Sequence, residues 1–194
     1  IFYGNMRLKE IFNSFEKGAL IFGYPVKDPE RYGILEFDKN GKVIGIEEKP
    51  KDPKSRYAVP GLYLYDNSVI KISENLEPSA RGELEITDVN RIYLENNELG
   101  TQIFGRGVAW LDTGTLESLN SATQFIFSVE KQQSYKISCP EEIALRLGYI
   151  TMKQFDTLVS NIPDCEYKKY LESVYDEIQY SDGAREAGIG ELQY

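Results

Sequence analysis

Residues 19–50 read ALIFGYPVKDPERYGILEFDKNGKVIGIEEKP, and this stretch holds the clearest strand signals in the chain. The short apolar run at 19–26 predicts a buried strand. Two segments of alternating polarity, at 34–38 and 42–48, flank Asp38-Lys39-Asn40-Gly41, whose residue types favour a tight turn. The stretch therefore predicts a buried strand followed by a β-hairpin.

Outward from this stretch, strand and helix patterns alternate through the first two thirds of the chain. Apolar residues three and four positions apart predict a helix at 8–15, ahead of the buried strand. Beyond the hairpin, the patterns predict strands at 57–66 and 101–111, helices at 69–75, 85–96 and 116–131, and then only helices, at 152–160, 166–178 and from Pro140. This order predicts an α/β mixed sheet over 1–115, a helical lobe over 116–180 and a flexible tail over 181–194.

The composition is that of an acidic globular chain. The 194 residues include 22 Lys and Arg against 31 Asp and Glu, which gives a formal net charge of -9. This charge argues against a protein that coats nucleic acid, because such a protein needs a basic stripe to displace counterions from phosphates. No run approaches the roughly 18 apolar residues of a membrane-spanning helix, and the first residues lack a signal-peptide pattern. We therefore expect a cytoplasmic protein with no membrane or nucleic-acid partner.

The chain contains no histidine, which narrows the possible chemistry. Ser-His-Asp and Cys-His hydrolases and HExxH metalloproteases are excluded, because each needs an imidazole that titrates near neutral pH. Cys139 and Cys165 lack the CxxC spacing of zinc sites, and two cysteines make no disulfide framework. An enzyme with this sequence would therefore use carboxylates, lysines, arginines and a hard metal ion.

Four short clusters could carry such chemistry, and each also has a plain structural interpretation. The first cluster is Arg31-Tyr32-Gly33. Its glycine can be explained by turn geometry alone, or the tyrosine hydroxyl beside the glycine backbone can bind a sugar. The second cluster is Glu47-Glu48-Lys49-Pro50. It can be a charged strand end in solvent, or Glu48 can accept hydrogen bonds from sugar hydroxyls while Lys49 binds a phosphate. Each of these two clusters is weak evidence when taken alone.

The other two clusters precede predicted helices. Segment 79–88 is a helix start with carboxylates in its first turn, or a site where Arg81 offers a bidentate donor to a phosphate. Trp110-Leu111-Asp112-Thr113-Gly114-Thr115 is capping chemistry, or a ligand site at the carboxyl end of a strand of an α/β sheet. In the second interpretation Asp112 suits Mg²⁺, which prefers one or two carboxylates together with substrate phosphates.

In their order along the chain, these clusters resemble the motifs of sugar-1-phosphate nucleotidylyltransferases, most closely the thymidylyltransferase branch. The resemblance covers residues 1–150 and fades towards the tail. It is carried by Ile1-Phe2-Tyr3-Gly4, Asp28-Pro29-Glu30-Arg31-Tyr32-Gly33, Glu47-Glu48-Lys49-Pro50, Tyr57-Ala58-Val59-Pro60-Gly61-Leu62-Tyr63, Arg81-Gly82-Glu83-Leu84-Glu85-Ile86-Thr87-Asp88, Trp110-Leu111-Asp112-Thr113-Gly114-Thr115 and Cys139-Pro140-Glu141-Glu142-Ile143-Ala144.

The resemblance implies a partial nucleotide-diphospho-sugar transferase fold, which is Rossmann-like, with a mixed sheet, a β-hairpin insertion and a C-terminal helical lobe. The implied activity joins glucose 1-phosphate to dTTP by Mg²⁺-dependent in-line displacement and releases pyrophosphate. The implied catalytic residues are Lys49 and Arg81, which would hold phosphates, and Asp112, which would ligate Mg²⁺. The implied sugar pocket is lined by Tyr32, Gly33, Glu48, Val59 and Tyr63, with Trp110 beside it.

The resemblance also implies regulation and assembly. Its members respond to a nucleotide sugar bound at a subunit interface of a homo-oligomer, which is a tetramer in the intact enzyme. By motif position, this regulatory site would use Tyr3, Gly4, Arg106, Glu142, Ile143 and Arg146.

Two parts of the family pattern are missing from the 194 residues. These are a glycine-rich, basic phosphate loop and a second metal aspartate, which would precede Ile1. We therefore expect a fragment that retains the sugar half and shows little or no activity by itself. Base selectivity belongs mainly to the missing part, so two alternatives stay open: a uridylyl or cytidylyl transferase relative, and an inactive fragment that binds nucleotide sugar and oligomerises. The helical lobe with Cys139-Pro140-Glu141-Glu142 favours the thymidylyl branch.

Overall fold

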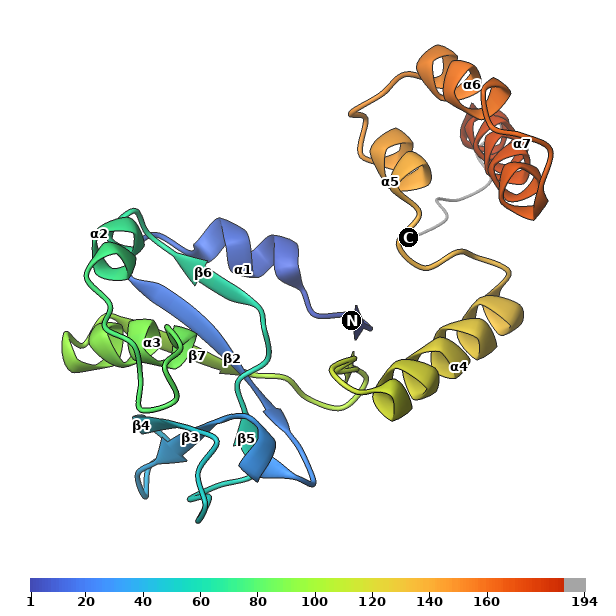
Figure 1. Ribbon diagram of the computed structural model, residues 1–194. Coiled ribbons are helices and arrows are strands. Elements are labelled where there is room, and N and C mark those ends of the chain that lie inside the picture. The colour runs from blue at the N-terminus through green and yellow to red at the C-terminus, as the bar shows by residue number, and fades with distance from the viewer. Residues whose placement is uncertain (187–194) are drawn as a thin grey trace. The chain divides into compact units, whose positions relative to one another are not determined.

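The computed structural model describes residues 1–186, with side chains through residue 178. The chain divides into two compact units, unit 1 over 1–114 and unit 2 from Thr115 onward, and each is described by itself (Figure 1). Of the tail predicted at 181–194, residues 181–186 continue the last helix, and 187–194 lie outside the described part.

Unit 1 consists of a mixed sheet, a small second sheet and three helices. In chain order its elements are β1 (Phe2–Tyr3), α1 (Leu8–Ser14), β2 (Ala19–Pro25), the 3-10 turn η1 (Pro29–Arg31), β3 (Gly33–Phe37), β4 (Val43–Glu48), β5 (Tyr57–Ala58), β6 (Tyr63–Tyr65), α2 (Ser68–Glu74), α3 (Ile86–Glu95), β7 (Leu99–Ile103) and β8 (Ala109–Trp110). The predicted β-hairpin is confirmed as β3 and β4, which pair in antiparallel fashion.

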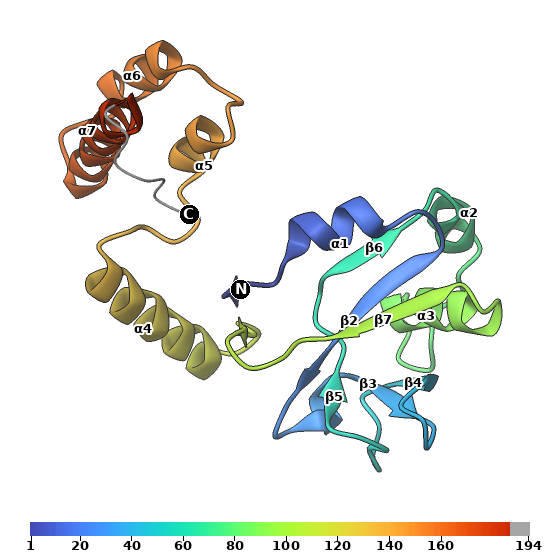
Figure 2. The ribbon, with the colours of Figure 1, turned by 180° about the vertical axis from the view of Figure 1, so that it is seen from behind.

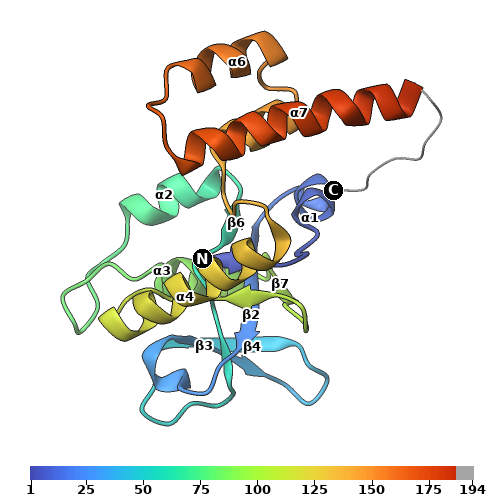
Figure 3. The same cartoon turned by 90° about the vertical axis from the view of Figure 1, so that its right-hand side faces the viewer.

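Strand β2 is the centre of the main sheet. β7 pairs with it in parallel, while β6 and β5 pair with it in antiparallel fashion, β6 at its start and β5 at its end. β5 also pairs with β3, so the sheet order is β4-β3-β5-β2-β6, with β7 added on β2. Figure 3 shows the β3–β4 hairpin at one end of this sheet. The parallel and antiparallel pairs in one sheet with helices confirm the predicted α/β mixed class.

The side chains of β2 alternate between two cores, as the period of a strand requires. Ala19 and Ile21 pack on the side of α3, where Tyr93 is fully buried. Phe22, on the opposite face, packs with Ile11 of α1 and is stacked on another aromatic ring. Helices α1 and α3 therefore cover opposite faces of the sheet (Figure 2).

Two predicted strands are interrupted in the structure. The strand predicted at 57–66 is split into β5 and β6 at Pro60, which has no N–H to donate to a ladder. The strand predicted at 101–111 ends at Ile103 and resumes as β8, because the turn around Gly107 has a φ of 93°. β8 pairs with β1 in a separate two-stranded sheet. Asp112 therefore does not follow a strand of the main sheet, contrary to the sequence interpretation.

Unit 2 is helical, as predicted. Its elements are α4 (Leu116–Gln133), α5 (Pro140–Arg146), α6 (Met152–Ser160) and α7 (Glu166–Glu186). Its core gathers Cys139, Phe155, Val159, Leu171 and Val174. Thr115 and Thr151 begin α4 and α6 with capping boxes, which satisfy the free N–H groups of the first turn. Within the described residues, no helix is both long and apolar enough to cross a membrane.

Candidate functional site

The β3–β4 ladder and the residue that follows β5 bring five of the predicted site residues together. Gly33 pairs with Glu48 across the ladder. The N–H of Lys49 donates to the carbonyl of Tyr32 at 3.0 Å, and the N–H of Val59 donates to the carbonyl of Gly33 at 2.8 Å. These contacts join three segments that are separated in the sequence, and they form one wall of the candidate site.

The carboxylate of Glu48 is oriented by a threonine on α3. Thr87 is 3% exposed, and its Oγ1 donates to Oε2 of Glu48 at 2.5 Å. A Cβ placed on Gly33 would lie 3.1 Å from both of these oxygen atoms, so a side chain at position 33 would press on the pair. The glycine therefore keeps room between the β3 backbone and an oriented carboxylate, an arrangement that can accept hydrogen bonds from hydroxyl groups.

The aromatic ring of Tyr63 lies close enough to Glu48 to respond to its charge. Burial of this side chain raises the pKa of the Tyr63 hydroxyl above its usual value, and the negative charge of Glu48 raises it further. Tyr63 therefore stays protonated at neutral pH and can donate a hydrogen bond. Its ring stacks on Tyr65, with centroids 5.8 Å apart.

Arg81 lies in the loop before α3, among three carboxylates. Its Nη1 is 3.3 Å from Oε1 of Glu85 and 3.9 Å from Oε1 of Glu48, and its Nη2 is 2.7 Å from Oε2 of Glu83. Oε1 of Glu85 also accepts a hydrogen bond from the hydroxyl of Ser79 at 3.0 Å. The structure therefore places the predicted phosphate-binding arginine beside the predicted sugar-binding carboxylate.

Two tyrosine rings pack against Trp110, and the three rings form an aromatic wall. The rings of Tyr32 and Trp110 lie 5.2 Å apart, and Tyr24 meets Trp110 edge-on at 5.8 Å. Burial raises the pKa of the Tyr32 hydroxyl above its usual value. An aromatic wall suits the apolar ring face of a sugar.

Asp112 is joined to this wall through Arg31. The guanidinium of Arg31 lies over the ring of Tyr32, at 5.4 Å from its centroid. Its Nη1 is 2.7 Å from Oδ2 of Asp28, and its Nη2 is 3.5 Å from Oδ2 of Asp112. The hydrogen bond to Asp28 is the largest of the contacts that raise the pKa of Arg31. One arginine thus bridges two carboxylates beside the aromatic wall.

The donor set suits a hard cation only in part. Asp112 offers one half-buried carboxylate, and Mg²⁺ commonly takes one or two carboxylates with the remaining ligands from phosphates and water. The described residues contain no group of three or more His, Cys, Asp or Glu side chains that could hold a metal by themselves. Asp112 therefore fits a site that a substrate phosphate would complete.

Lys49 follows β4 directly and has a strained backbone conformation. Its φ is 44°, in the left-handed region that a side chain makes unfavourable, and the residue is exposed. No ion pair of Lys49 is found among the described residues. A strained, exposed lysine beside an oriented carboxylate is typical of a functional position.

Sequence reasoning assigned no role to Thr87, Asn90 or Arg31. Thr87 and Asn90 are buried on the face of α3 that also carries Val89 and Tyr93. Polar residues at helical spacing on an apolar face were the available signal, because buried polar groups need partners. Asn90 accepts a hydrogen bond from the Tyr65 hydroxyl at 2.5 Å.

Three residues of the predicted regulatory site gather in unit 1. Tyr3 pairs with Ala109 where β1 meets β8. Gly4 has a φ of 118°, and a Cβ added to it would lie 2.0 Å from the carbonyl oxygen of Gly107. Only glycine fits at position 4, directly beside the turn that contains the exposed Arg106.

The other three residues of that set lie on α5 in unit 2. Glu142 is buried and pairs with Arg146 at 2.8 Å, and it also accepts a hydrogen bond from the hydroxyl of Tyr170. Nη2 of Arg146 is 3.3 Å from Oε2 of Glu177, while Ile143 is exposed. Each group is described within its own unit, so the regulatory site as a whole stays a prediction.

Comparisons with known proteins place the chain among nucleotide-transferring enzymes. A model of the nucleotidyl transferase family matches residues 3–129. A glucose-1-phosphate thymidylyltransferase of Neisseria gonorrhoeae is 50% identical over 173 residues, which are 88% of this chain and 60% of the relative. One from Mycolicibacterium smegmatis is 48% identical over 178 residues, which are 91% of this chain and 62% of the relative. The chain thus spans about 60% of the length of these relatives.

Solved structures agree on the fold. A putative glucose-1-phosphate thymidylyltransferase from Bacillus anthracis, in complex with a sucrose, matches 64% of this chain and 50% of that chain with a TM-score of 0.57 and 44% identity. A UDP-glucose pyrophosphorylase complexed with UDP-glucose matches 63% of this chain and 48% of that chain with a TM-score of 0.55 and 18% identity, which supports the fold alone.

Proposed function

The chain belongs to the nucleotidyl transferase family, and on this premise we propose that it forms the sugar-phosphate part of a glucose-1-phosphate thymidylyltransferase. Such an enzyme joins glucose 1-phosphate to dTTP and releases pyrophosphate. Identities near 50% over most of this chain support the proposal. Because the chain spans about 60% of these relatives, we derive only the part of the reaction that its own residues would serve.

The oriented carboxylate of Glu48 is the observation that carries this proposal. The bond from Thr87 engages Oε2, which lies on the side of Gly33, while Oε1 lies 3.9 Å from Nη1 of Arg81. A fixed acceptor beside a glycine backbone can accept hydrogen bonds from neighbouring sugar hydroxyls, while the rings of Tyr32 and Trp110 cover the apolar part of the sugar.

The reaction needs no histidine, in keeping with the composition. The phosphate of a sugar phosphate is already an anionic nucleophile near neutral pH. Positioning and charge neutralisation then supply most of the catalysis in phosphoryl transfer. Lys49 and Arg81 would hold the two anions together despite their mutual repulsion. Arg81 can release Glu83 at little cost, because a pair between such exposed side chains contributes little stability.

Enzymes of this family generally depend on a divalent metal ion, and we propose Mg²⁺ with Asp112 as one ligand. The ion would offset negative charge on the phosphates and on the departing pyrophosphate. Asp112 would have to exchange its contact with Arg31 for the ion. Arg31 would keep its shorter bond to Asp28 during this exchange.

We further propose that the protein acts in the cytoplasm as a homo-oligomer, and that it is regulated by a nucleotide sugar. Regulation would use Tyr3, Gly4 and Arg106 of unit 1 and Glu142, Ile143 and Arg146 of unit 2. In α5, the Glu142 carboxylate is already held by Arg146 and Tyr170.

Pyrophosphate release tests the reaction, and sugar-phosphate binding tests the site. The folded chain is mixed with glucose 1-phosphate, Mg²⁺ and, separately, dTTP, UTP, CTP or ATP. We expect binding of glucose 1-phosphate with little or no pyrophosphate release, because the 194 residues include no glycine-rich triphosphate loop.

The possible outcomes separate the alternatives. Release with dTTP above the other nucleotides would establish the thymidylyl reaction and overturn the expected inactivity. Release with UTP or CTP instead would identify a uridylyl or cytidylyl transferase. Failure of the folded chain to bind glucose 1-phosphate at millimolar concentration would contradict the proposed sugar site.

A further inference from the structure

The outer edge of β7 is free in the described part of the chain. β7 runs parallel to β2, and no other strand pairs with it there. At the two ends of this pairing, the carbonyl of Glu98 accepts from the N–H of Ala19, and the N–H of Phe104 donates to the carbonyl of Gly23, both at 2.9 Å. The even-numbered residues from 98 to 104 therefore direct their backbone groups towards β2.

The odd-numbered residues of β7 direct theirs outward, since backbone groups alternate along a strand. The N–H and C=O groups of Leu99, Thr101 and Ile103 thus form an unpaired row. Natural edge strands are usually protected by a charged residue, a proline or a bulge. The segment 99–103 contains no charged residue and no proline, and it pairs with β2 without a register shift.

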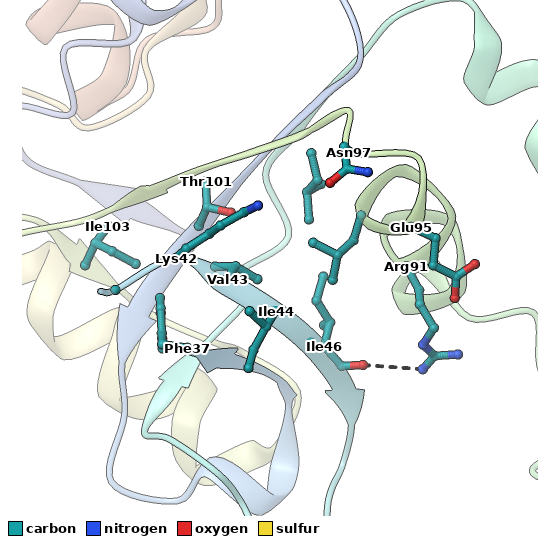
Figure 4. A pocket seen from close by; sticks show the side chains of 14 residues that line it. Phe37, Lys42, Val43, Ile44, Ile46, Arg91, Glu95, Asn97, Thr101 and Ile103 are labelled. Carbon is teal, nitrogen blue, oxygen red and sulfur yellow. Dashed lines mark hydrogen bonds between the residues drawn. The ribbon is translucent and has the colours of Figure 1, made fainter. Parts of the chain in front are cut away.

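A cavity of about 640 Å³ lies beside the face of β7 that carries the side chains of its odd-numbered residues (Figure 4). The side chains of Leu99, Thr101 and Ile103 line it together with Val43 and Ile44 from the hairpin. Ile103 is 42% exposed and Ile44 is 52% exposed, so apolar surface is open beside the unpaired backbone. None of the predicted catalytic, sugar-binding or regulatory residues lines this cavity.

The other ends of the sheet offer less to a partner. The outer side of β4 is approached by α3, whose Arg91 donates from Nη2 to the carbonyl of Ile46 at 3.4 Å. β6 has only three residues. β7 is therefore the free edge with the longest run of regular strand beside open apolar surface.

We propose that β7 pairs with β7 of a second copy of this chain, in antiparallel fashion about a two-fold axis at Thr101. In an antiparallel ladder, two opposite residues exchange both of their hydrogen bonds only if both point their backbone groups at each other. When Thr101 lies opposite itself, Leu99 lies opposite Ile103, and every outward group of both strands finds a partner. No other register pairs all three odd-numbered residues.

The polarity of β7 favours a second copy over an unrelated peptide. In this register Leu99 of each copy lies opposite Ile103 of the other and forms an apolar pair beside the cavity. Thr101 of one copy lies opposite Thr101 of the other, and cross-strand threonine pairs stabilise sheets. The residues that line the cavity include both signs of charge, with Lys42 and Arg91 against Glu95. The inference concerns assembly and does not rest on the proposed reaction.

A disulfide tests this register directly. Opposite residues in a hydrogen-bonded antiparallel pair have Cα atoms about 5.5 Å apart, within the range of a disulfide. Thr101→Cys, in a Cys165→Ser background that leaves only the buried Cys139, should form a covalent dimer under mild oxidation. Ile103→Cys is the matched control, because its thiol is exposed on the same face but would lie roughly 13 Å from its counterpart, four residues along the strand.

Sedimentation equilibrium supplies the second readout. Thr101→Pro removes the outward N–H without removing a bond to β2, so the fold should persist by circular dichroism while the dimer dissociation constant rises at least tenfold. Thr101→Val keeps the N–H and should stay dimeric. A monomeric parent chain at tens of micromolar, an unchanged mass for Thr101→Pro, or equal cross-linking of Thr101→Cys and Ile103→Cys would each overturn the proposal.

Discussion

Replacing Thr87 by valine should weaken unit 1 and lower its affinity for glucose 1-phosphate. Thr87 is buried, and its hydroxyl donates to the carboxylate of Glu48 at 2.5 Å. Valine keeps the shape of the side chain but removes the donor. The Oε2 atom of Glu48 would then lose its hydrogen bond inside a packed wall.

The size of the effect follows from the surroundings of Glu48. A hydrogen bond to a charged group contributes about 1.5–3 kcal/mol net. The side chain of Glu48 keeps 23% of its exposure, so water replaces part of the lost bond, and we expect the lower end of this range. A free-energy change of about 1.4 kcal/mol corresponds to a tenfold change in an equilibrium constant, so the folding equilibrium constant of unit 1 should fall about tenfold.

Trp110 makes the measurement specific to unit 1. It is the single tryptophan of the sequence, so its fluorescence during urea denaturation reports the unfolding of the unit that contains the Thr87 bond. Thr87→Ser keeps the hydroxyl and is the control. A double-mutant cycle with Glu48→Gln isolates the coupling between the two side chains. A coupling energy near zero, with an unchanged midpoint for Thr87→Val, would show that Thr87 does not hold Glu48.

Three further predictions concern the same unit. Lys49→Ala should lower glucose 1-phosphate affinity at least tenfold by titration calorimetry without lowering the urea midpoint, because the side chain is exposed at a strained φ; a lowered midpoint would make it structural. Hydrogen bonds, above all from the N–H of Gly18, hold the pKa of Asp66 below its ordinary value of 3.8. The ionised carboxylate therefore stabilises the folded state above pH 3.8, and this stabilisation is lost as the pH falls through the lowered pKa. Asp66→Asn should therefore flatten acid unfolding followed by Trp110 fluorescence, and an unchanged acid profile would contradict this. Asp112→Asn should weaken Mg²⁺ binding measured in the presence of glucose 1-phosphate, whereas equal Mg²⁺ affinity would remove Asp112 from the metal site.

Local patterns were enough to predict most elements of the fold. The hairpin was predictable because its turn residues and its alternating strands are neighbours in the sequence. The same holds for α3, whose apolar spacing is local, and for α4, whose capping box at Thr115 is local. The breaks at Pro60 and around Gly107 were missed, although proline and glycine are both residues that interrupt strands.

The candidate site was predicted through the order of its motifs, and its geometry was not. Sequence clusters indicated Glu48, Arg81 and Asp112 as separate features. The structure shows that Glu48 is oriented by Thr87 and that Asp112 contacts Arg31, both across long sequence separations. Such contacts have no periodic signature, so a single sequence could not reveal them.

Composition and the spacing of apolar residues are enough to set the chemical limits and the local elements of this protein. The absence of histidine, the acidic charge and the spacing of apolar residues are properties that need no partner in space. Tertiary structure alone decided that β2 is the centre of the sheet, that Trp110 faces Tyr32, and that β7 keeps a free edge beside a cavity. The reason is physical: strand pairing and side-chain contacts join residues many positions apart, and the choice among possible partners depends on which arrangement buries the most apolar surface while satisfying the backbone.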